Sequence, residues 1–156
     1  MKLLKFATLS GIFAAQFAFA QFAQSPLPYA YNALETAVDA QTMEIHYTKH
    51  AAGYVNNLNK AIAGTSLAKE SLTTILSHIS KQNTTIRNNA GGHYNHELFW
   101  TMLTPEKNTK PSEKLSKAII EKFGSLETFK TEIAKAGADR FGSGWAWLIV
   151  TPENKL

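Results

Sequence analysis

The hydrophobic and polar positions in the N-terminal part of the chain repeat with the period of amphipathic helices. Residues 37–63 contain no proline and are followed by Gly64, so they predict one long helix. Residues 68–80 carry apolar side chains at positions i, i+3, i+4 and i+7, which predicts a second helix. Residues 93–103 follow two consecutive glycines and precede Pro105, and they predict a third helix.

The C-terminal part of the chain combines shorter helices with an extended segment. It begins at a polar connection, residues 108–112. Apolar positions predict a helix over residues 115–123 and another after Ser125, a residue type that caps helix N-termini. The aromatic and β-branched run 145–150 predicts a strand, and residues 151–155 predict a turn. Because a strand needs a partner, we expect the printed sequence to stop inside a hairpin.

The first twenty residues have the three-part composition of a secretory signal peptide. Residues 1–5 carry two lysines, residues 6–19 are mostly apolar, and a small-x-small triplet ends at Ala20. Cleavage there would leave 136 of the 156 residues and, by removing the two lysines, would lower the formal net charge from +4 to +2. The apolar run is short for a bilayer span, so we expect an exported protein, periplasmic or extracellular, with no membrane segment after cleavage. The alternative is a buried N-terminal helix.

The composition narrows the chemistry that the chain can support. With 44% hydrophobic and 11% aromatic residues, the chain is suited to a packed core and not to disorder. The sequence has no cysteine, which excludes disulfides, thiolate metal sites and cysteine nucleophiles. A metal site would therefore use histidine, aspartate or glutamate. The sequence has no sustained basic face, and we expect no nucleic-acid partner.

Two of the predicted helices carry histidine and aromatic side chains at helical spacing. His46, His50 and Tyr54 are four residues apart, which places them on one stripe of the first helix. On the third helix, His96 and Trp100 share a face. Two antiparallel helices can bring one histidine each to a common metal ion. The same spacing also fits histidines that are exposed or hydrogen-bonded in a core, and tryptophans that are ordinary core residues.

Several longer strings carry more information than spacing does. They are LPYAYNALE at 27–35, DAQTMEIHYTKH at 39–50, YVNNLN at 54–59, RNNAGGHYNH at 87–96, LFW at 98–100 and FGSGWAWL at 141–148. With these strings in this order, the chain closely resembles the iron/manganese superoxide dismutase family over nearly all of residues 21–156.

The resemblance implies an α+β fold. An N-terminal antiparallel helical hairpin would occupy residues 21–109, after the signal peptide at residues 1–20. A C-terminal α/β half with a small antiparallel three-stranded sheet would follow over residues 110–156, and we expect it to be incomplete in this sequence.

The resemblance also implies roles for individual side chains. His46 and His96 match metal ligands, and an Asp-x-Trp-Glu-His-Ala motif that would supply two more ligands does not occur in these 156 residues. Tyr54 matches the tyrosine at the substrate gateway, and His50 matches the neighbouring histidine that helps to relay protons. His93 matches a histidine that does not bind the metal. The aromatic residues that wall the metal pocket match Trp100, Trp145 and Trp147.

The function implied by the resemblance is antioxidant: superoxide dismutation, in which two superoxide radicals become oxygen and hydrogen peroxide at one redox-cycling manganese or iron ion per subunit. Manganese is favoured, because Gly92 stands where iron-type members tend to carry glutamine. The family implies a homodimer or homotetramer. The alternatives are an inactive metal-binding fragment or a helical interaction module, because two of the family's ligands are not found in this sequence.

Overall fold

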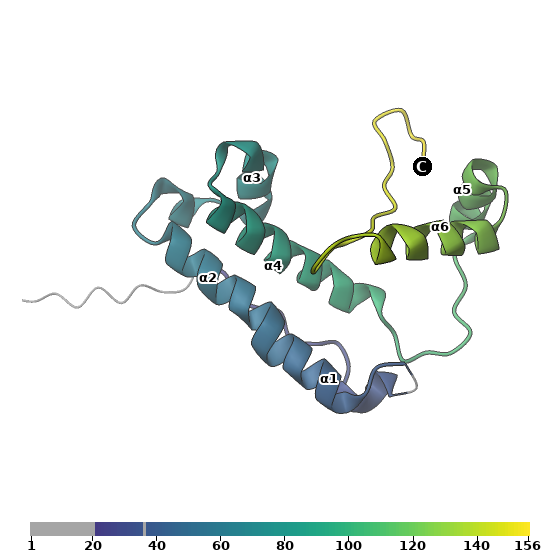
Figure 1. The fold of residues 1–156 in the computed structure, drawn as a ribbon, viewed down its shortest axis with the longest axis horizontal. Coiled ribbons are helices and arrows are strands. Elements are labelled where there is room, and N and C mark those ends of the chain that lie inside the picture. Colours follow the sequence, from purple (N-terminus) through teal and green to yellow (C-terminus); the bar gives the residue numbers. More distant parts are fainter. Residues whose placement is uncertain (1–20, 36) are drawn as a thin grey trace, which may run out of the picture. The chain divides into compact units, whose positions relative to one another are not determined.

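The computed structural model describes residues 21–35 and 37–156 of the chain, and the predicted signal peptide lies outside the described residues. The helices of this part, in chain order, are the 3-10 helix η1 (Tyr31–Leu34), α1 (Ala40–Ile45), the π-helix η2 (His46–Ala51), α2 (Ala52–Ile62), the 3-10 helix η3 (Ser66–Lys69), α3 (Leu72–Ser77), the 3-10 helix η4 (Ile79–Lys81), α4 (Thr84–Met102), α5 (Glu113–Phe123) and α6 (Leu126–Ala138) (Figure 1). Among these described helices, none combines the length and the apolar character that crossing a bilayer requires.

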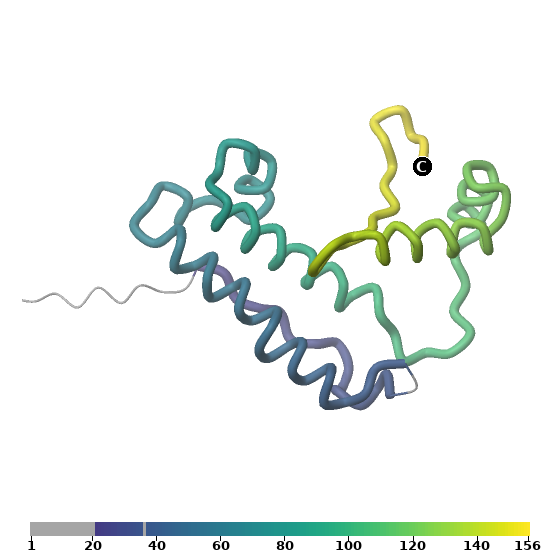
Figure 2. The backbone as a smooth tube through the Cα atoms, in the orientation of Figure 1, coloured from purple at the N-terminus to yellow at the C-terminus, as the bar shows by residue number. Residues whose placement is uncertain are grey.

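The chain divides into two compact units. The described part of unit one consists of residues 21–26 and 45–94, and the described part of unit two consists of residues 27–44 and 95–156 without Thr36. Two helical rods therefore pass from one unit into the other: the rod from α1 through η2 into α2, and helix α4. Within unit one, Figure 2 shows η2 and α2 as one continuous coil.

Unit one is organised around an apolar cluster contributed by α2, α3 and the first half of α4. The buried members of this cluster are Leu58, Ile62, Ile75, Ile86 and Ala90, none more than 5% exposed. Burying a large aliphatic side chain contributes roughly 1.5–3 kcal/mol, so these few residues supply much of the stability of the unit.

The long helix predicted over residues 37–63 starts later than predicted and contains a wider turn. Its first α-helical residue is Ala40, because Asp39 caps the N-terminus: one carboxylate oxygen accepts the Thr42 N–H at 2.8 Å and the other accepts the Thr42 hydroxyl at 2.7 Å. The π-helical turn η2 was not predicted, since apolar periodicity does not distinguish one extra residue in a turn. The helix ends at Ile62, close to the predicted end at residue 63.

The predicted helix at residues 68–80 is only partly correct. The α-helical segment is limited to α3, which begins after Ser71, whose hydroxyl accepts the Thr74 N–H at 3.1 Å. The 3-10 helices η3 and η4 flank α3 on either side. Serine and threonine side chains, such as that of Ser71, compete for backbone hydrogen bonds. This competition explains why the segment forms three short helices instead of one long helix.

The start of the third helix was predicted wrongly. Helix α4 begins at Thr84, nine residues before the predicted start, and the two glycines lie within it. Asn83 provides the start signal: its side-chain oxygen accepts the Ile86 N–H at 3.0 Å, and its carbonyl accepts the Arg87 N–H at 2.9 Å. Each interior glycine costs about 1 kcal/mol relative to alanine, which a long packed helix tolerates.

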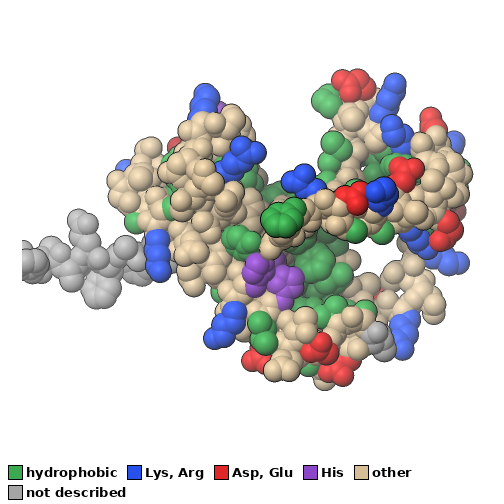
Figure 3. Space-filling view, in the orientation of Figure 1, with side chains coloured by type: hydrophobic (Ala, Val, Ile, Leu, Met, Phe, Trp, Pro, Cys, Tyr) green, Lys and Arg blue, Asp and Glu red, His purple; other side chains and the backbone are tan. Residues whose placement is uncertain are grey.

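The two helices predicted after residue 112 are confirmed and form a hairpin within unit two. Ser112 caps α5 and Ser125 caps α6, each accepting the N–H of the residue three positions later. The rings of Phe123 and Phe129 pack at a centroid distance of 5.2 Å across the hairpin. On the face shown in Figure 3, acidic and basic side chains are interspersed over α5 and α6. Lys130 pairs there with Glu127 at 2.8 Å.

The predicted strand at residues 145–150 is wrong for the described part of the chain. Residues 21–35 and 37–156 contain no strand, and residues 145–150 form no regular secondary structure. β-branched and aromatic residues favour strand formation, but a strand also needs an adjacent backbone to pair with, which these residues do not supply. The turn that follows is confirmed, since the Thr151 N–H donates to the Lys155 carbonyl at 2.7 Å and the Asn154 N–H donates to the Thr151 carbonyl at 2.9 Å.

Candidate metal centre

Three of the predicted site residues form a row of rings in unit one. The His46 and His50 rings are 5.3 Å apart between centroids, and the His50 and Tyr54 rings are 5.1 Å apart in an edge-on arrangement. The ligand nitrogens of the two histidines lie within 4.8 Å of each other. His46 and Tyr54 are half-buried, whereas His50 is exposed. The row therefore begins at the half-buried imidazole of His46, continues through the exposed imidazole of His50, and ends at the half-buried ring of Tyr54.

The π-helical turn explains how the three rings stay in line. In an α-helix, a step of four residues advances about 40° around the axis, so a pair of such steps would rotate Tyr54 by about 80° from His46. The π turn η2 includes more residues per turn, and it therefore offsets this drift over the segment from His46 to Ala51. Such turns occur frequently at functional sites.

The ring of Tyr54 lies directly against the backbone of Gly92 on helix α4. A Cβ atom built on Gly92 would overlap the ring, with a separation of only 2.6 Å from Cγ. Gly92 is buried. The close approach therefore requires glycine, and it fixes the position of Tyr54 relative to α4 within unit one.

A second group of predicted site residues lies together in unit two. His96 is 2% exposed, and its ring packs edge-on against Trp145 at 5.2 Å and obliquely against Trp100 at 5.8 Å. Phe99 completes the aromatic group, at 5.3 Å from Trp100 and 5.4 Å from Trp145. Phe99 lies within the LFW string, but no role was predicted for it. The structure thus surrounds a buried imidazole with aromatic rings.

The remaining tryptophan, Trp147, is more exposed than Trp100. The side chain of Trp147 is 46% exposed, whereas Trp100 is only 2% exposed. Trp147 is therefore open to solvent, unlike the buried Trp100. The predicted walling role of Trp147 stays a prediction.

Tyr29 is a contact of the aromatic group that the sequence did not identify. Its hydroxyl donates to the backbone carbonyl of Trp100 at 3.1 Å, near the C-terminal end of α4, where carbonyls lack intrahelical donors. Burial raises the pKa of the Tyr29 phenol above its usual range, because desolvation disfavours the phenolate. The signal that was available is the position of Tyr29 in the quoted LPYAY string.

The other histidines have different surroundings. His93 is 4% exposed, and its ring lies 6.0 Å from the ring of Phe22 in unit one. His78 is exposed, and its Nδ1 lies 3.0 Å from the Ser77 hydroxyl.

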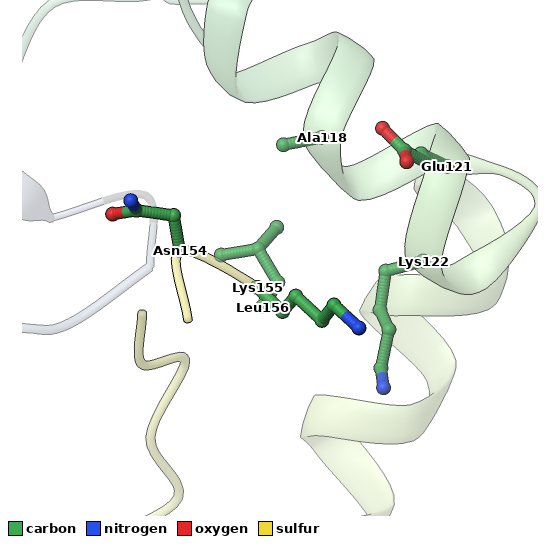
Figure 4. A pocket seen from close by; sticks show the side chains of 6 residues that line it. All are labelled: Ala118, Glu121, Lys122, Asn154, Lys155 and Leu156. Carbon is green, nitrogen blue, oxygen red and sulfur yellow. The ribbon is translucent and has the colours of Figure 1, made fainter. Parts of the chain in front are cut away.

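A hollow elsewhere in unit two contains none of the predicted site residues. It has a volume of about 220 Å³ and lies between α5 and the end of the chain (Figure 4). Its lining residues are Ala118, Glu121, Lys122, Asn154, Lys155 and Leu156. With charges of both signs and no histidine, this hollow offers no metal-binding set.

Comparison with known protein families identifies the class of protein. The family model for the alpha-hairpin domain of iron/manganese superoxide dismutases matches residues 21–104, and the model for the C-terminal domain of the same family matches residues 111–156. The chain belongs to the iron/manganese superoxide dismutase family, and the resemblance drawn from the motifs is confirmed. The chain has the predicted architecture of this family. A helical N-terminal hairpin domain is followed by a segment of the C-terminal α/β domain.

Individual relatives cover most of the chain. The manganese superoxide dismutase of Acinetobacter baylyi is 54% identical over 141 residues, which is 89% of this chain and 62% of the relative. The manganese/iron superoxide dismutase of Methylomonas sp. (strain J) is 53% identical over 84% of this chain and 67% of the relative. The iron superoxide dismutase of Raoultella planticola is 49% identical over 82% of this chain and 78% of the relative. The chain thus spans about two thirds of the length of the relatives that it matches.

Proposed function

We propose that the protein is a superoxide dismutase, which converts two superoxide radicals and two protons into oxygen and hydrogen peroxide. The observation that carries this proposal is the pair of ring clusters at the matched positions: the row from His46 to Tyr54, and the buried His96 among aromatic rings. The printed names of relatives that are about 50% identical support the same activity.

We propose that His46 and His96 are metal ligands. The donor chemistry fits, because each offers a neutral imidazole nitrogen, a ligand that first-row transition metals accept. The 2% exposure of His96 and its two tryptophan neighbours, Trp145 edge-on and Trp100 oblique, keep that imidazole oriented and dry. When bound, a manganese or iron ion supplies the one-electron oxidation and reduction of superoxide. We propose one ion per subunit, as membership of the family implies.

Manganese is our preferred metal, and the contact between Tyr54 and Gly92 supports this choice. Iron-type members tend to carry glutamine where this chain has Gly92. The ring of Tyr54 occupies the space that any side chain at position 92 would need. A glutamine there would displace Tyr54, so the packing favours the manganese-type arrangement. The names of the relatives include both metals.

His50 and Tyr54 supply the protons that peroxide formation consumes. His50 is exposed, so its imidazole exchanges protons with solvent, and its ring contacts that of Tyr54 at 5.1 Å. The Tyr54 hydroxyl can donate a proton and be reprotonated, the role expected of a general acid near the reacting group. Within unit two, Trp100 and Trp145 exclude water around His96, which strengthens local electrostatic interactions.

We also propose export and self-association. The composition of residues 1–20 supports a signal peptide and a periplasmic or extracellular location. A homodimer or homotetramer is proposed from membership of the family. Intact mass and native mass of the protein recovered from the producing cell would test the cleavage and the assembly respectively.

The decisive experiment uses the whole gene product, with any residues that follow Leu156, loaded with manganese or iron. Stopped-flow measurement of superoxide decay should show metal-dependent consumption far above that of the free ion. His96→Ala should remove this activity, whereas the matched control His78→Ala, at an exposed histidine, should retain it. A loaded wild-type protein that consumes no superoxide would overturn the proposal. Tight metal binding without turnover would instead favour the metal-binding alternative, and no metal binding would favour the interaction module.

A further inference from the structure

The described N-terminal segment of unit one, residues 21–26, is an extended strap that lies along the helical rod. Its backbone is bound to α2 by a reciprocal pair of hydrogen bonds. The Phe22 N–H donates to the Asn59 side-chain oxygen at 3.0 Å, and the Asn59 amide donates to the Phe22 carbonyl at 2.8 Å. The strap therefore has a fixed position on the rod before it reaches the π turn.

A second reciprocal pair binds the strap to the π turn η2. The side-chain amide of Gln24 donates to the Tyr47 carbonyl at 3.1 Å, and the Tyr47 hydroxyl donates to the Ser25 carbonyl at 2.8 Å. Gln24 and Tyr47 are both half-buried, so solvent competes less for the bond from Gln24 to the Tyr47 carbonyl than it would at an open surface. One residue of the turn is thus held through both its backbone and its side chain.

The Tyr47 carbonyl is one of the acceptors of the wide turn. The Ala52 N–H is shared between the carbonyls of Tyr47, five residues earlier, and Lys49, three residues earlier. A shared N–H gives each carbonyl a weaker bond than a full i→i−4 bond would. Gln24 supplies a second donor to the Tyr47 carbonyl, and it favours the conformation in which that carbonyl points to the strap.

We propose that Gln24 is a positioning residue that stabilises the π turn and, through it, the alignment of the His46, His50 and Tyr54 rings. The inference rests on the proposed function for its consequence, because His46 is the proposed ligand at the start of the turn. The stabilising contact itself depends only on the strap and the helix. Without the Gln24 donor, the turn loses one of the bonds that offset its poorer backbone geometry, and the ring row becomes less well ordered.

The test compares variants of the whole gene product by hydrogen–deuterium exchange of the peptide that covers residues 46–54. Gln24→Glu keeps the size of the side chain and removes the donor, and it should speed exchange in this peptide by about three- to tenfold, as expected for one lost hydrogen bond. Gln24→Lys keeps a donor at a similar reach and should restore slow exchange. The matched control is Gln21→Glu, the same change in the same strap, where the side chain bonds to the Glu70 carbonyl outside the turn.

Faster exchange in Gln24→Glu, together with rescue by Gln24→Lys and wild-type exchange in Gln21→Glu, would support the inference. Unchanged exchange in Gln24→Glu, an equal effect of Gln21→Glu, or no rescue by Gln24→Lys would overturn it. In the metal-loaded protein, the visible absorption of the trivalent ion should shift in Gln24→Glu and not in Gln21→Glu. The exchange result needs neither metal nor activity, so a failure of the proposed dismutase function is distinguishable from a failure of this inference.

Discussion

The ring of Tyr54 lies directly against Gly92 because Gly92 has no side chain. The ring occupies the volume where a Cβ atom of residue 92 would stand. The contact joins helix α2 to helix α4 within unit one. It accounts for a glycine in the interior of a helix, because a Cβ at position 92 would overlap the Tyr54 ring.

Gly92→Ala should destabilise the protein and displace Tyr54. Overpacking of this kind costs about 1–3 kcal/mol, of which the better helix propensity of alanine returns up to about 1 kcal/mol. Gly91→Ala is the matched control, since a Cβ there meets nothing within 4 Å, and it should stabilise by about 0.5–1 kcal/mol. Urea denaturation of both variants measures the difference. Equal effects of the two substitutions would contradict the packing that we describe.

Ser125→Ala should weaken the start of α6. The Ser125 hydroxyl accepts the Thr128 N–H at 3.0 Å, and loss of such a cap costs about 1 kcal/mol. Ser125→Asp retains an acceptor and should keep wild-type stability. The midpoint of denaturant unfolding distinguishes the two variants, and an Asp variant as unstable as the Ala variant would argue against a capping role.

Asp39 should make the stability of the chain depend on acid pH. Hydrogen bonds from the Thr42 hydroxyl and N–H lower the pKa of Asp39 below its ordinary value of 3.8. A carboxyl with a lowered folded-state pKa contributes stability that is fully present above 3.8 and is lost as the pH falls through the folded-state value. Asp39→Asn keeps an oxygen acceptor and removes the titration, so its melting temperature should fall less between pH 5 and pH 2, taken as a window of about 3 pH units around the carboxyl pKa. Identical melting curves across this range would refute the assignment.

Tyr29→Phe should loosen the end of α4 behind His96. The variant loses the hydrogen bond to the Trp100 carbonyl, which contributes about 0.5–1.5 kcal/mol. Burial raises the pKa of Tyr29 above its ordinary value of 10.0. Its contribution to the free energy of unfolding is therefore fully present below pH 10.0 and is lost as the pH rises through the folded-state pKa. Unfolding of the wild type should therefore approach that of Tyr29→Phe in strong alkali. A constant gap between them from neutral to alkaline pH would contradict this account.

Several parts of the fold were predictable because their signals are local. The apolar positions of α5 and the Ser125 cap of α6 specify those helices from a few neighbouring residues. The motif strings identified the family, whereas the metal-ligand roles of His46 and His96 stay predictions. The start of α4 was missed although its cap, Asn83, is also local, because the two glycines outweighed it in the sequence interpretation.

The sequence by itself determined the helix-forming segments, the family and the residue types available for a metal, since these depend on side-chain chemistry and short-range backbone preferences. Only the tertiary structure decided which of these residues touch. Gly92 looks like a helix breaker until Tyr54 lies against it, and Gln24 looks like a linker residue until the Tyr47 carbonyl turns toward it. Residues 145–150 have strand-forming side chains and no strand, because β-pairing needs a second backbone that local preference cannot provide.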